Sequence, residues 1–432
     1  MNGTSAAEGL AALELAIRTA MTNLGGSLLE RLLAADSGYR GPRVACGCGQ
    51  KAEFVAYRTK LVDTVLGPIV LNRAYYHCTT CGHGLAPKDT ELGLAGASLS
   101  PGLRAMVAHV GAAAPFAKAT GLLTELAGVE LTTKRVERSA EADGLAIAVA
   151  TADEAASVVA GKVVPLGPVE PVDRLYIALD GTGVPTVPAE TEGRAGKAAD
   201  GRAHTREVKL GVVFSQTSLD ELGRPVRDAH SSTYVATFEP AHSFGALLYA
   251  EACRRGVAHA RQVIVLGDGA PWIWKLADLH FPSATQVVDF YHAREHLYAL
   301  GALVAPDLGE DSGAWLNERL AELAHGDIPA LLAAARKLAL PEAKTIELDK
   351  AIGYFATNAE RMRYAQFRSL GHFIGSGVVE AGCKSLIGAR LKLSGMRWTI
   401  SGASGIATLR CHDASERWEE IWLRIHNQMR VA

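Results

Sequence analysis

The sequence of 432 residues lacks several features that would assign it to a common class of protein. No run of uncharged apolar residues approaches the length that crosses a membrane, and the N-terminus lacks the basic-then-apolar layout of a signal peptide. The net charge is −2, so any polyanionic partner must be held by local patches rather than by overall basicity. These absences lead us to expect a cytoplasmic protein with no membrane partner.

Two motifs of phosphate chemistry are also missing. There is no Gly-x-x-x-x-Gly-Lys-Ser/Thr loop, which argues against a nucleotide-binding P-loop. An Asp-Gly-Thr sequence does follow the apolar residues 175–179, as it does in haloacid-dehalogenase phosphatases. The position of their nucleophilic aspartate is Ala178 here, so a covalent aspartyl-phosphate is excluded.

Cysteine is scarce, with seven copies that are unevenly placed. Four of them form two short pairs, Cys46-x-Cys48 and Cys78-x-x-Cys81. The intervening residues alternate as in a β-hairpin, and thiolates are the soft ligands that zinc prefers. We therefore expect a zinc ribbon with a structural Zn²⁺ over residues 44–90.

The ligand set of this ribbon leaves alternatives open. Because a Cys-x-Cys pair is the less common spacing, His77 or His83 could replace a thiolate. Four free structural cysteines are the other reading. Arg58, Lys60 and Arg73 lie on the predicted strands, where they would touch phosphates or form a solvated charged face.

The rest of the N-terminal half is expected to be helical. Residues 1–43 carry apolar residues at helical spacing, which predicts a segment that packs on a later element or on a second copy of the chain. Over residues 98–170, Ser100 and Thr132 or Thr133 are candidate N-caps, and Arg135 lies in the opening turn of the last helix. This layout is typical of a helix-turn-helix DNA-binding region followed by a linker helix, although helical hairpins without DNA are common.

Two aspartates come directly after apolar runs in residues 171–294. Asp180 follows residues 175–179 and precedes a Gly-Thr-Gly turn, and Asp268 follows a second such run. The expected element order, β-β-β-α-β-α-β, is the plan of an RNase H-like fold with acids at its first and fourth strands. The alternative is that each aspartate merely caps a tight turn beside its neighbouring glycine.

A third acid belongs to the end of the chain. Residues 295–370 read as amphipathic helices inserted before the last core helix, which opens residues 371–432 and carries Glu380. Basic side chains and one indole follow this acid, a composition that suits a phosphate backbone and an unpaired base: Lys384, Arg390, Lys392, Arg397 and Trp398. The alternatives are a solvent-facing glutamate and a tryptophan that packs in the core.

Three carboxylates of this kind suit phosphoryl transfer by two metal ions. Asp180 could bridge two Mg²⁺ or Mn²⁺ ions, with Asp268 on one and Glu380 on the other. Asp289 and His292 follow the fifth strand as Asp-x-x-His. Either Asp289 only caps the next helix, or the pair supports the site.

Six ordered blocks together resemble the ISKra-type transposases of bacterial insertion sequences. The blocks are Leu179-Asp-Gly-Thr-Gly-Val-Pro185, Arg206-Glu-Val-Lys-Leu-Gly211, Gly267-Asp-Gly-Ala-Pro-Trp-Ile-Trp274, Val288-Asp-Phe-Tyr-His-Ala-Arg-Glu-His-Leu297, Gly375-Ser-Gly-Val-Val-Glu-Ala-Gly-Cys-Lys384 and Ser394-Gly-Met-Arg-Trp398. The Asp-x-x-His block is also similar to a motif of Mutator-like and hAT transposases.

The resemblance implies an α/β multidomain DDE transposase with an RNase H-like core, whose catalytic acids are Asp180, Asp268 and Glu380. It implies transposon-end and target DNA as partners, a nucleoid-associated location, and at least a homodimer, because two ends must be synapsed. A catalytically silent DNA-binding regulator and a structure-specific nuclease of the RNase H-like class are the alternatives.

Overall fold

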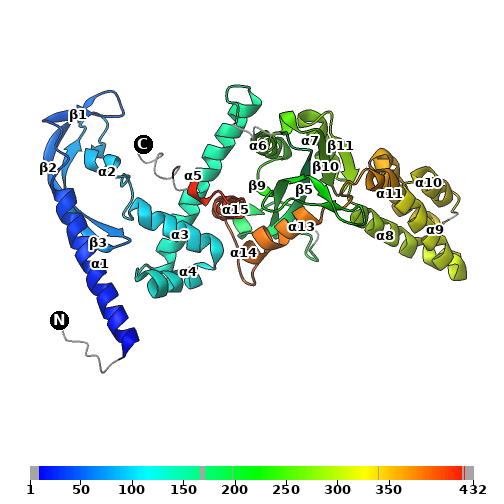
Figure 1. Ribbon diagram of the computed structural model, residues 1–432, viewed down its shortest axis with the longest axis horizontal. Coiled ribbons are helices and arrows are strands. Elements are labelled where there is room, and N and C mark those ends of the chain that lie inside the picture. Colours follow the sequence, from blue (N-terminus) through cyan, green and yellow to red (C-terminus); the bar gives the residue numbers. More distant parts are fainter. Residues whose placement is uncertain (1–8, 166–170, 197, 339, 421–422, 424–432) are drawn as a thin grey trace. The chain divides into compact units, whose positions relative to one another are not determined.

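The protein is described here by a computed structural model that covers residues 9–165, 171–196, 198–338, 340–420 and 423. The chain is a mixed α/β protein that divides into two compact units (Figure 1). Unit 1 contains residues 1–147 and 417–432, and unit 2 contains residues 148–416. Helix α5 (Thr133–Val159) begins in the first unit and ends in the second, so the boundary lies inside the helical region of residues 98–170.

Unit 1 contains a four-stranded sheet in the order β1-β2-β3-β4, in which every neighbouring pair is antiparallel. Its elements are α1 (Leu10–Ala34), β1 (Arg43–Ala45), β2 (Lys51–Thr64), β3 (Gly67–His77), β4 (Gly84–Leu85) and α2 (Pro87–Glu91). The long β2–β3 hairpin confirms the hairpin predicted between the two cysteine pairs. Its inward side chains, with Leu29 and Leu33 of α1, form a small core.

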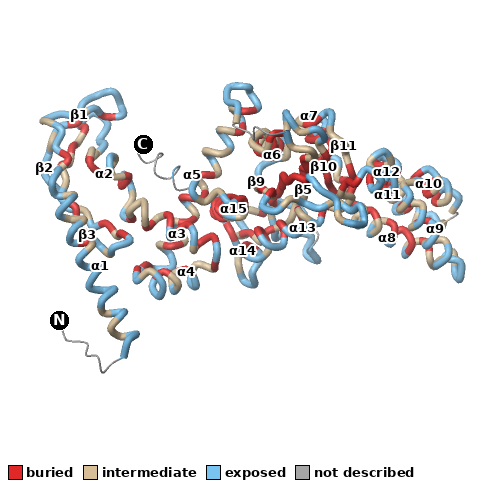
Figure 2. Tube along the Cα trace, in the orientation of Figure 1, coloured by how far each residue is buried: buried red, intermediate tan, exposed pale blue. Residues whose placement is uncertain are grey.

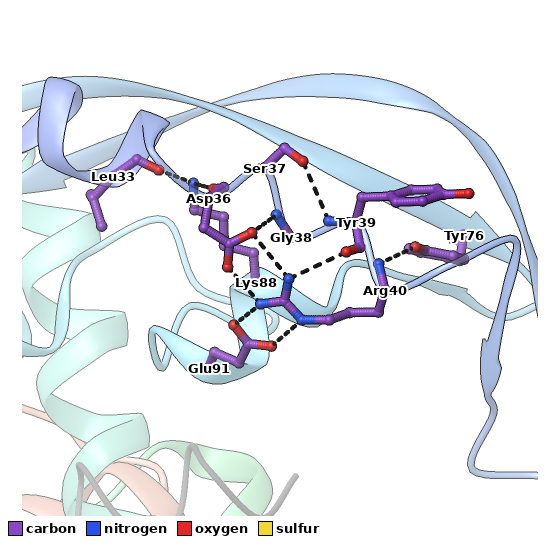
Figure 3. Close-up of polar contacts among 9 residues, drawn as sticks. All are labelled: Leu33, Asp36, Ser37, Gly38, Tyr39, Arg40, Tyr76, Lys88 and Glu91. Carbon is purple, nitrogen blue, oxygen red and sulfur yellow. Dashed lines mark hydrogen bonds and ion pairs between the residues drawn. The ribbon is translucent and has the colours of Figure 1, made fainter.

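The loop after α1 is tied to this sheet by a polar network (Figure 3). Arg40 forms ion pairs of 2.6 Å with both Asp36 and Glu91, and it holds the pKa of the Asp36 carboxyl well below its usual range. Lys88 donates to the backbone carbonyls of Leu33 and Asp36. These contacts join the C-terminal end of α1 to α2, so they hold the helix in one orientation on the sheet.

The helices of unit 1 include the two whose N-caps the sequence predicts. They are α3 (Pro101–Ala113), α4 (Phe116–Leu122), a π-helix η2 (Leu123–Ala127) and the first part of α5. Ser100 caps α3 by accepting from the N–H of Leu103, and the predicted cap of α5 is Thr132, whose hydroxyl accepts from the N–H of Arg135. Residues 417–420 join this unit, where the Trp418 ring lies against His109.

Unit 2 is built on a five-stranded mixed sheet in the order β11-β10-β5-β6-β9. Its strands are β5 (Arg174–Pro185), β6 (Thr205–Gln216), β9 (Thr233–Thr237), β10 (Gln262–Gly267) and β11 (Thr285–Val288). Strands β5, β6 and β9 pair antiparallel, whereas β10 and β11 join them in parallel. The central strand β5 is buried from Leu175 to Leu179, as its continuous apolar run predicts.

The predicted Gly-Thr-Gly turn after Asp180 is wrong. Strand β5 continues through Gly181 and Gly183 to Pro185, and β6 pairs with it along this whole length. A Cβ at Gly181 would lie 2.6 Å from the carboxylate of Glu207 on β6. The glycines therefore provide space beside the partner strand, rather than a turn.

Helices cover both faces of this sheet. Helix α6 (Ala241–Arg254) packs over Gly211, where an added Cβ would meet Leu248 and Phe244. Helix α13 (Gly377–Gly382) packs over the neighbouring Leu210, whose side chain points to the opposite face. Buried apolar side chains of the sheet and of the helices on it form one core. Figure 2 shows the central strands of this sheet mostly in the colour of buried residues.

A group of helices separates β11 from α13, as the sequence predicts. They are α8 (Phe290–Leu308), α9 (Ser312–His325), α10 (Ile328–Arg336), α11 (Glu342–Asn358) and α12 (Tyr364–Ser369). Helix α8 begins before residue 295, because Asp289 caps it directly after β11. After α13 the chain continues as a π-helix η7 (Cys383–Gly388), α14 (Ala389–Leu391) and α15 (Ile400–Ala414), the last of which packs on β9.

Candidate active site and cysteine cluster

Asp180 and Asp268 lie at the same level of two adjacent parallel strands. The register pairs Ala178 of β5 with Leu266 of β10. Each aspartate comes two residues later in the chain, Asp180 within β5 and Asp268 just after the end of β10. Neighbouring strands lie about 4.8 Å apart, and residues at equal level point to the same face. The sheet therefore holds the two carboxylates side by side.

Glu380 is brought to the same place by α13. A polar pocket of about 280 Å³ is lined by all three predicted acids, together with residues from α8 and from the turn before α13: Leu179, Asp180, Asp268, Tyr291, His292, Glu295, Ser376 and Glu380. The hydroxyl of Ser376 lies 3.3 Å from Oε1 of Glu380. Three acids that are far apart in the sequence thus line one cavity.

Asp289 connects the elements around this pocket and is fully buried. Its Oδ1 accepts from the backbone N–H of His292 at 2.8 Å, which caps α8. Its Oδ2 accepts from the hydroxyl of Ser376 at 2.6 Å and also from the Ser376 N–H. Asp289 is therefore a helix cap and also the residue that positions the start of α13, while His292 lines the pocket.

The surroundings of Asp180 disfavour the negative charge of its carboxylate. Burial raises the pKa of its carboxyl above the usual range, and the nearby Asp268 raises it further. The Cys383 thiol and the N–H of Gly181, at 2.7 Å, donate hydrogen bonds that oppose this rise. Cys383 reaches Asp180 from the first turn of the π-helix η7, whose wider turn directly follows the short helix that carries Glu380.

A second layer of aromatic groups supports Asp268. The Tyr354 hydroxyl donates to the backbone carbonyl of Asp268 at 3.1 Å, and the His296 ring stacks on Tyr354 with centroids 3.8 Å apart. Burial lowers the pKa of His296, which favours its neutral form. Both residues come from the inserted helices, which therefore form part of the wall behind the site.

Sequence reasoning missed Tyr291, Glu295 and Ser376 in the pocket lining. Glu295 is exposed on α8, and it lines the pocket because it lies one turn after His292 on the same face of the helix. That spacing was a usable signal. For Ser376, nothing local to the sequence pointed to the buried carboxylate of Asp289.

The basic residues that follow Glu380 divide into two groups. Lys384, Lys392 and Arg397 are exposed. Arg390 and Trp398 are buried, with the guanidinium over the indole ring and the indole N–H donating to the Leu391 carbonyl at 3.0 Å. The suggestion that Trp398 stacks on a base and Arg390 meets a phosphate is therefore corrected, because core packing covers both side chains.

The predicted DNA-contacting residue of unit 1 has internal partners. Arg135 forms an ion pair of 2.6 Å with Asp63 and donates to the Ser98 hydroxyl at 2.9 Å. Lys60 and Arg73 both pair with Asp89, at 2.9 and 2.7 Å. These cations hold the ribbon and its neighbouring loops together.

The four predicted zinc ligands converge. Ligand atoms of Cys46, Cys48, Cys78 and Cys81 all lie within 4.8 Å of one another, and neither His77 nor His83 belongs to this cluster. The Sγ atoms of Cys46 and Cys81 are 3.6 Å apart, and those of Cys48 and Cys78 are 3.7 Å apart. A tetrahedral site with zinc–sulfur bonds of about 2.3 Å has edges of about 3.8 Å, so the cluster fits a structural metal such as zinc.

A backbone N–H favours the thiolate form of one of these cysteines. The N–H of Cys81 donates to the Cys78 sulfur, which lowers the pKa of Cys78 to about 6. A thiolate is the form that binds zinc. Among the residues that the structure describes, no other group of three or more acidic, histidine or cysteine side chains is as tightly gathered, and the acids of the pocket are spaced more widely.

Comparisons with known proteins do not identify the chain: no family model matches the sequence, and no curated protein matches it. Within the described part of the chain, no helix combines the length and the apolar character needed to cross a membrane.

Proposed function

We propose that the chain is a DDE-type DNA transposase with an RNase H-like core, which cleaves insertion-sequence ends and joins them to target DNA. The observation that carries the proposal is the shared pocket of Asp180, Asp268 and Glu380. The strand order β11-β10-β5-β6-β9, with three antiparallel and two parallel members, supports the fold assignment. The sequence resemblance to ISKra-type transposases supports the reaction.

The residues present suit divalent metal ions. Carboxylate oxygens are the ligands that Mg²⁺ and Mn²⁺ prefer. Burial, and then the nearby Asp268, raise the pKa of Asp180, and a bound cation would stabilise its ionised form. Two ions about 3.5–4 Å apart require ligands on both outer sides, which agrees with acids that do not close around one point. Ions bound there would activate the attacking oxygen and stabilise the departing one.

The protein's own groups have distinct parts in this scheme. In this scheme Asp180, on the central strand, would contact both ions, whereas Asp268 and Glu380 would each hold one. His292 lines the pocket beside them and can donate a hydrogen bond to a phosphate oxygen. Asp289 acts through Ser376 and the start of α13, so it positions Glu380.

The DNA would approach through a neighbouring cavity. A space of about 670 Å³ shares Tyr291 and Glu380 with the pocket, and Arg224 and Arg368 also line it. Arginines beside an open cavity suit a phosphate backbone. The exposed Lys384, Lys392 and Arg397 extend the same kind of charge on the segment after Glu380.

The test uses the full-length protein and a donor plasmid that carries its gene with both natural flanks. With Mg²⁺, we expect cleavage at the element boundaries and joined products on a target plasmid. Asp268→Asn should lower cleavage by at least about a hundredfold, the loss typical of removing one group that stabilises the transition state. Asp278→Asn, an exposed aspartate on α7 (Pro271–His280), is the matched control.

The other outcomes favour other functions. If the wild-type protein and Asp268→Asn are equally inert with Mg²⁺ and Mn²⁺ but bind the flanks, the chain is a DNA-binding regulator. If the protein cuts without joining, it is a nuclease. Either result would overturn the transposase proposal.

A further inference from the structure

Helix α1 presents an apolar face that the rest of unit 1 leaves uncovered. Its inner side, with the buried Gly26 and with Leu29 and Leu33, packs on the β2–β3 hairpin. The outer side carries Ile17, Met21, Leu24 and Leu28, which are each between 50 and 62% exposed. Figure 2 shows the colour of exposed residues recurring along the whole of α1, interrupted by partly buried positions.

These four residues form a regular seam, and the exposed Leu15 and Leu32 lie outside it. Successive members are separated by four, three and four residues, which is the heptad spacing of a helix that packs against another helix. At 100° per residue the seam points roughly opposite to Gly26 and Leu33, so the contact with the sheet does not cover it. Continuing the same spacing adds Glu14 and Leu10 at one end and Arg31 at the other.

We propose that this seam binds the same seam of a second copy of the chain, with the two α1 helices antiparallel. In an antiparallel pair, residues whose numbers have a constant sum face each other. A sum of 45 places Met21 opposite Leu24 of the second copy and Ile17 opposite its Leu28. The same register places Glu14 opposite Arg31 of the second copy, and by symmetry each contact occurs twice.

Charge selects this orientation over the parallel one. A parallel pair would place Glu14 against Glu14 and Arg31 against Arg31, so like charges would meet inside the seam. The antiparallel pair turns both into opposite-charge contacts. Among the described residues neither Glu14 nor Arg31 has an ion-pair partner within its own chain.

The seam is just large enough for a specific contact between two copies. Four apolar side chains per copy, extended by Leu10, present on the order of 1,000 Å² in the pair, near the lower limit for a specific interface. Ala20 and Ser27 flank the seam and are small enough to let two helices approach closely. The Arg40 network fixes the end of α1, so little ordering is needed for binding.

The first test is the mass of the full-length protein by sedimentation velocity over a range of concentrations. We expect a dimer, and we expect Glu14→Arg or Arg31→Glu to weaken it by about tenfold or more, because each places like charges together twice. The double variant Glu14→Arg/Arg31→Glu should restore the dimer. Glu130→Arg, an exposed glutamate elsewhere in unit 1, should leave it unchanged.

A chemical crosslink tests the register independently of any loss of folding. Arg31→Lys keeps the charge and allows a zero-length carbodiimide bond between Glu14 and Lys at position 31. Within one helix these positions are about 25 Å apart, so such a bond must join two copies. A monomeric wild-type protein, a dimer unmoved by the single reversals, or a double variant that stays dissociated would each overturn the proposal, as would the absence of this crosslink. The inference does not depend on the catalytic proposal.

Discussion

At the scale of single residues, the site concentrates negative charge in a place where burial disfavours it. Asp180 lies on the central strand of the sheet, and Asp268 directly follows the neighbouring strand β10 at the same level. Burial and this neighbour both raise the pKa of its carboxyl. The sheet brings the two carboxylates together, because residues at equal levels of neighbouring parallel strands have their side chains on the same face.

The raised pKa predicts that Asp180 destabilises the metal-free protein at neutral pH. The folded chain binds the proton more tightly than the unfolded chain, so ionisation costs stability as the pH rises above 3.8 and through the folded pKa. Asp180→Asn should therefore raise the free energy of unfolding at neutral pH by about 1 kcal/mol, as expected on relieving a strained functional site, while abolishing cleavage. Urea denaturation at several pH values measures this.

This gain in the free energy of unfolding should vanish below pH 3.8, where the Asp180 carboxyl is protonated in both the folded and the unfolded chain. The control is Asp173→Asn, a partly exposed residue just before β5 with a long ion pair of 3.9 Å to Arg261, which should change stability little. A destabilised Asp180→Asn at neutral pH, or a gain independent of pH, would contradict this account of Asp180.

At the scale of elements, the candidate site depends on how three segments are joined. Asp289 accepts hydrogen bonds from the N–H groups of His292 and Ser376 and from the Ser376 hydroxyl. Its own N–H donates to the Gly267 carbonyl at 2.7 Å. The carboxylate of Asp289 thus links the starts of α8 and α13, and its backbone N–H joins both to the end of β10.

This arrangement predicts that Asp289→Asn is costly although the shapes are nearly equal. An amide NH₂ group would face backbone N–H donors, so at least one donor would lose its acceptor inside the protein. The loss should be about 2–4 kcal/mol in the free energy of unfolding. It should be accompanied by loss of cleavage, because Glu380 follows Ser376 by one turn.

Asp327→Asn provides the matched comparison. Asp327 also caps a helix, α10, but it is exposed and accepts one bond, from the N–H of Ala330 at 3.1 Å. Asparagine caps helices about as well as aspartate, so this change should be nearly neutral. Equal effects of the two substitutions in chemical denaturation would refute the special role of Asp289.

At the scale of the whole molecule, the two units contain separate apolar cores. In unit 1, one small core contains Cys46 and Cys78, and another joins α1 to the β2–β3 hairpin. The core of unit 2 is large and continuous. A ribbon with so little apolar interior needs another source of stability. The geometry of the four cysteines points to a bound metal as that source.

We therefore expect one zinc ion per chain and two thermal transitions in calorimetry. A strong zinc chelator, or Cys78→Ser, should remove the transition of unit 1 and leave that of unit 2 in place. Cys253→Ser on α6 should keep both transitions and the zinc, since Cys253 lies outside the cluster. A protein that retains no zinc when purified, or one whose two transitions shift together on chelation, would contradict this expectation.

The sequence alone was sufficient for features with local causes. The cysteine spacing, the β2–β3 hairpin, the cap at Ser100 and the buried strand before Asp180 all follow from neighbours in the chain, and each is present in the structure. The candidate acids were also found this way, because each stands beside a conspicuous apolar or glycine-rich stretch.

Tertiary structure decided what depends on distant partners. Strand β5 continues through Gly181 because β6 supplies its hydrogen bonds. Trp398 is buried where its backbone pairs with that of Pro185 and Val187. The meeting of Asp289 with Ser376 and the uncovered side of α1 belong to the same class. Such contacts join residues far apart along the chain, so no local pattern records them, and only the packed chain determines which side chains become partners.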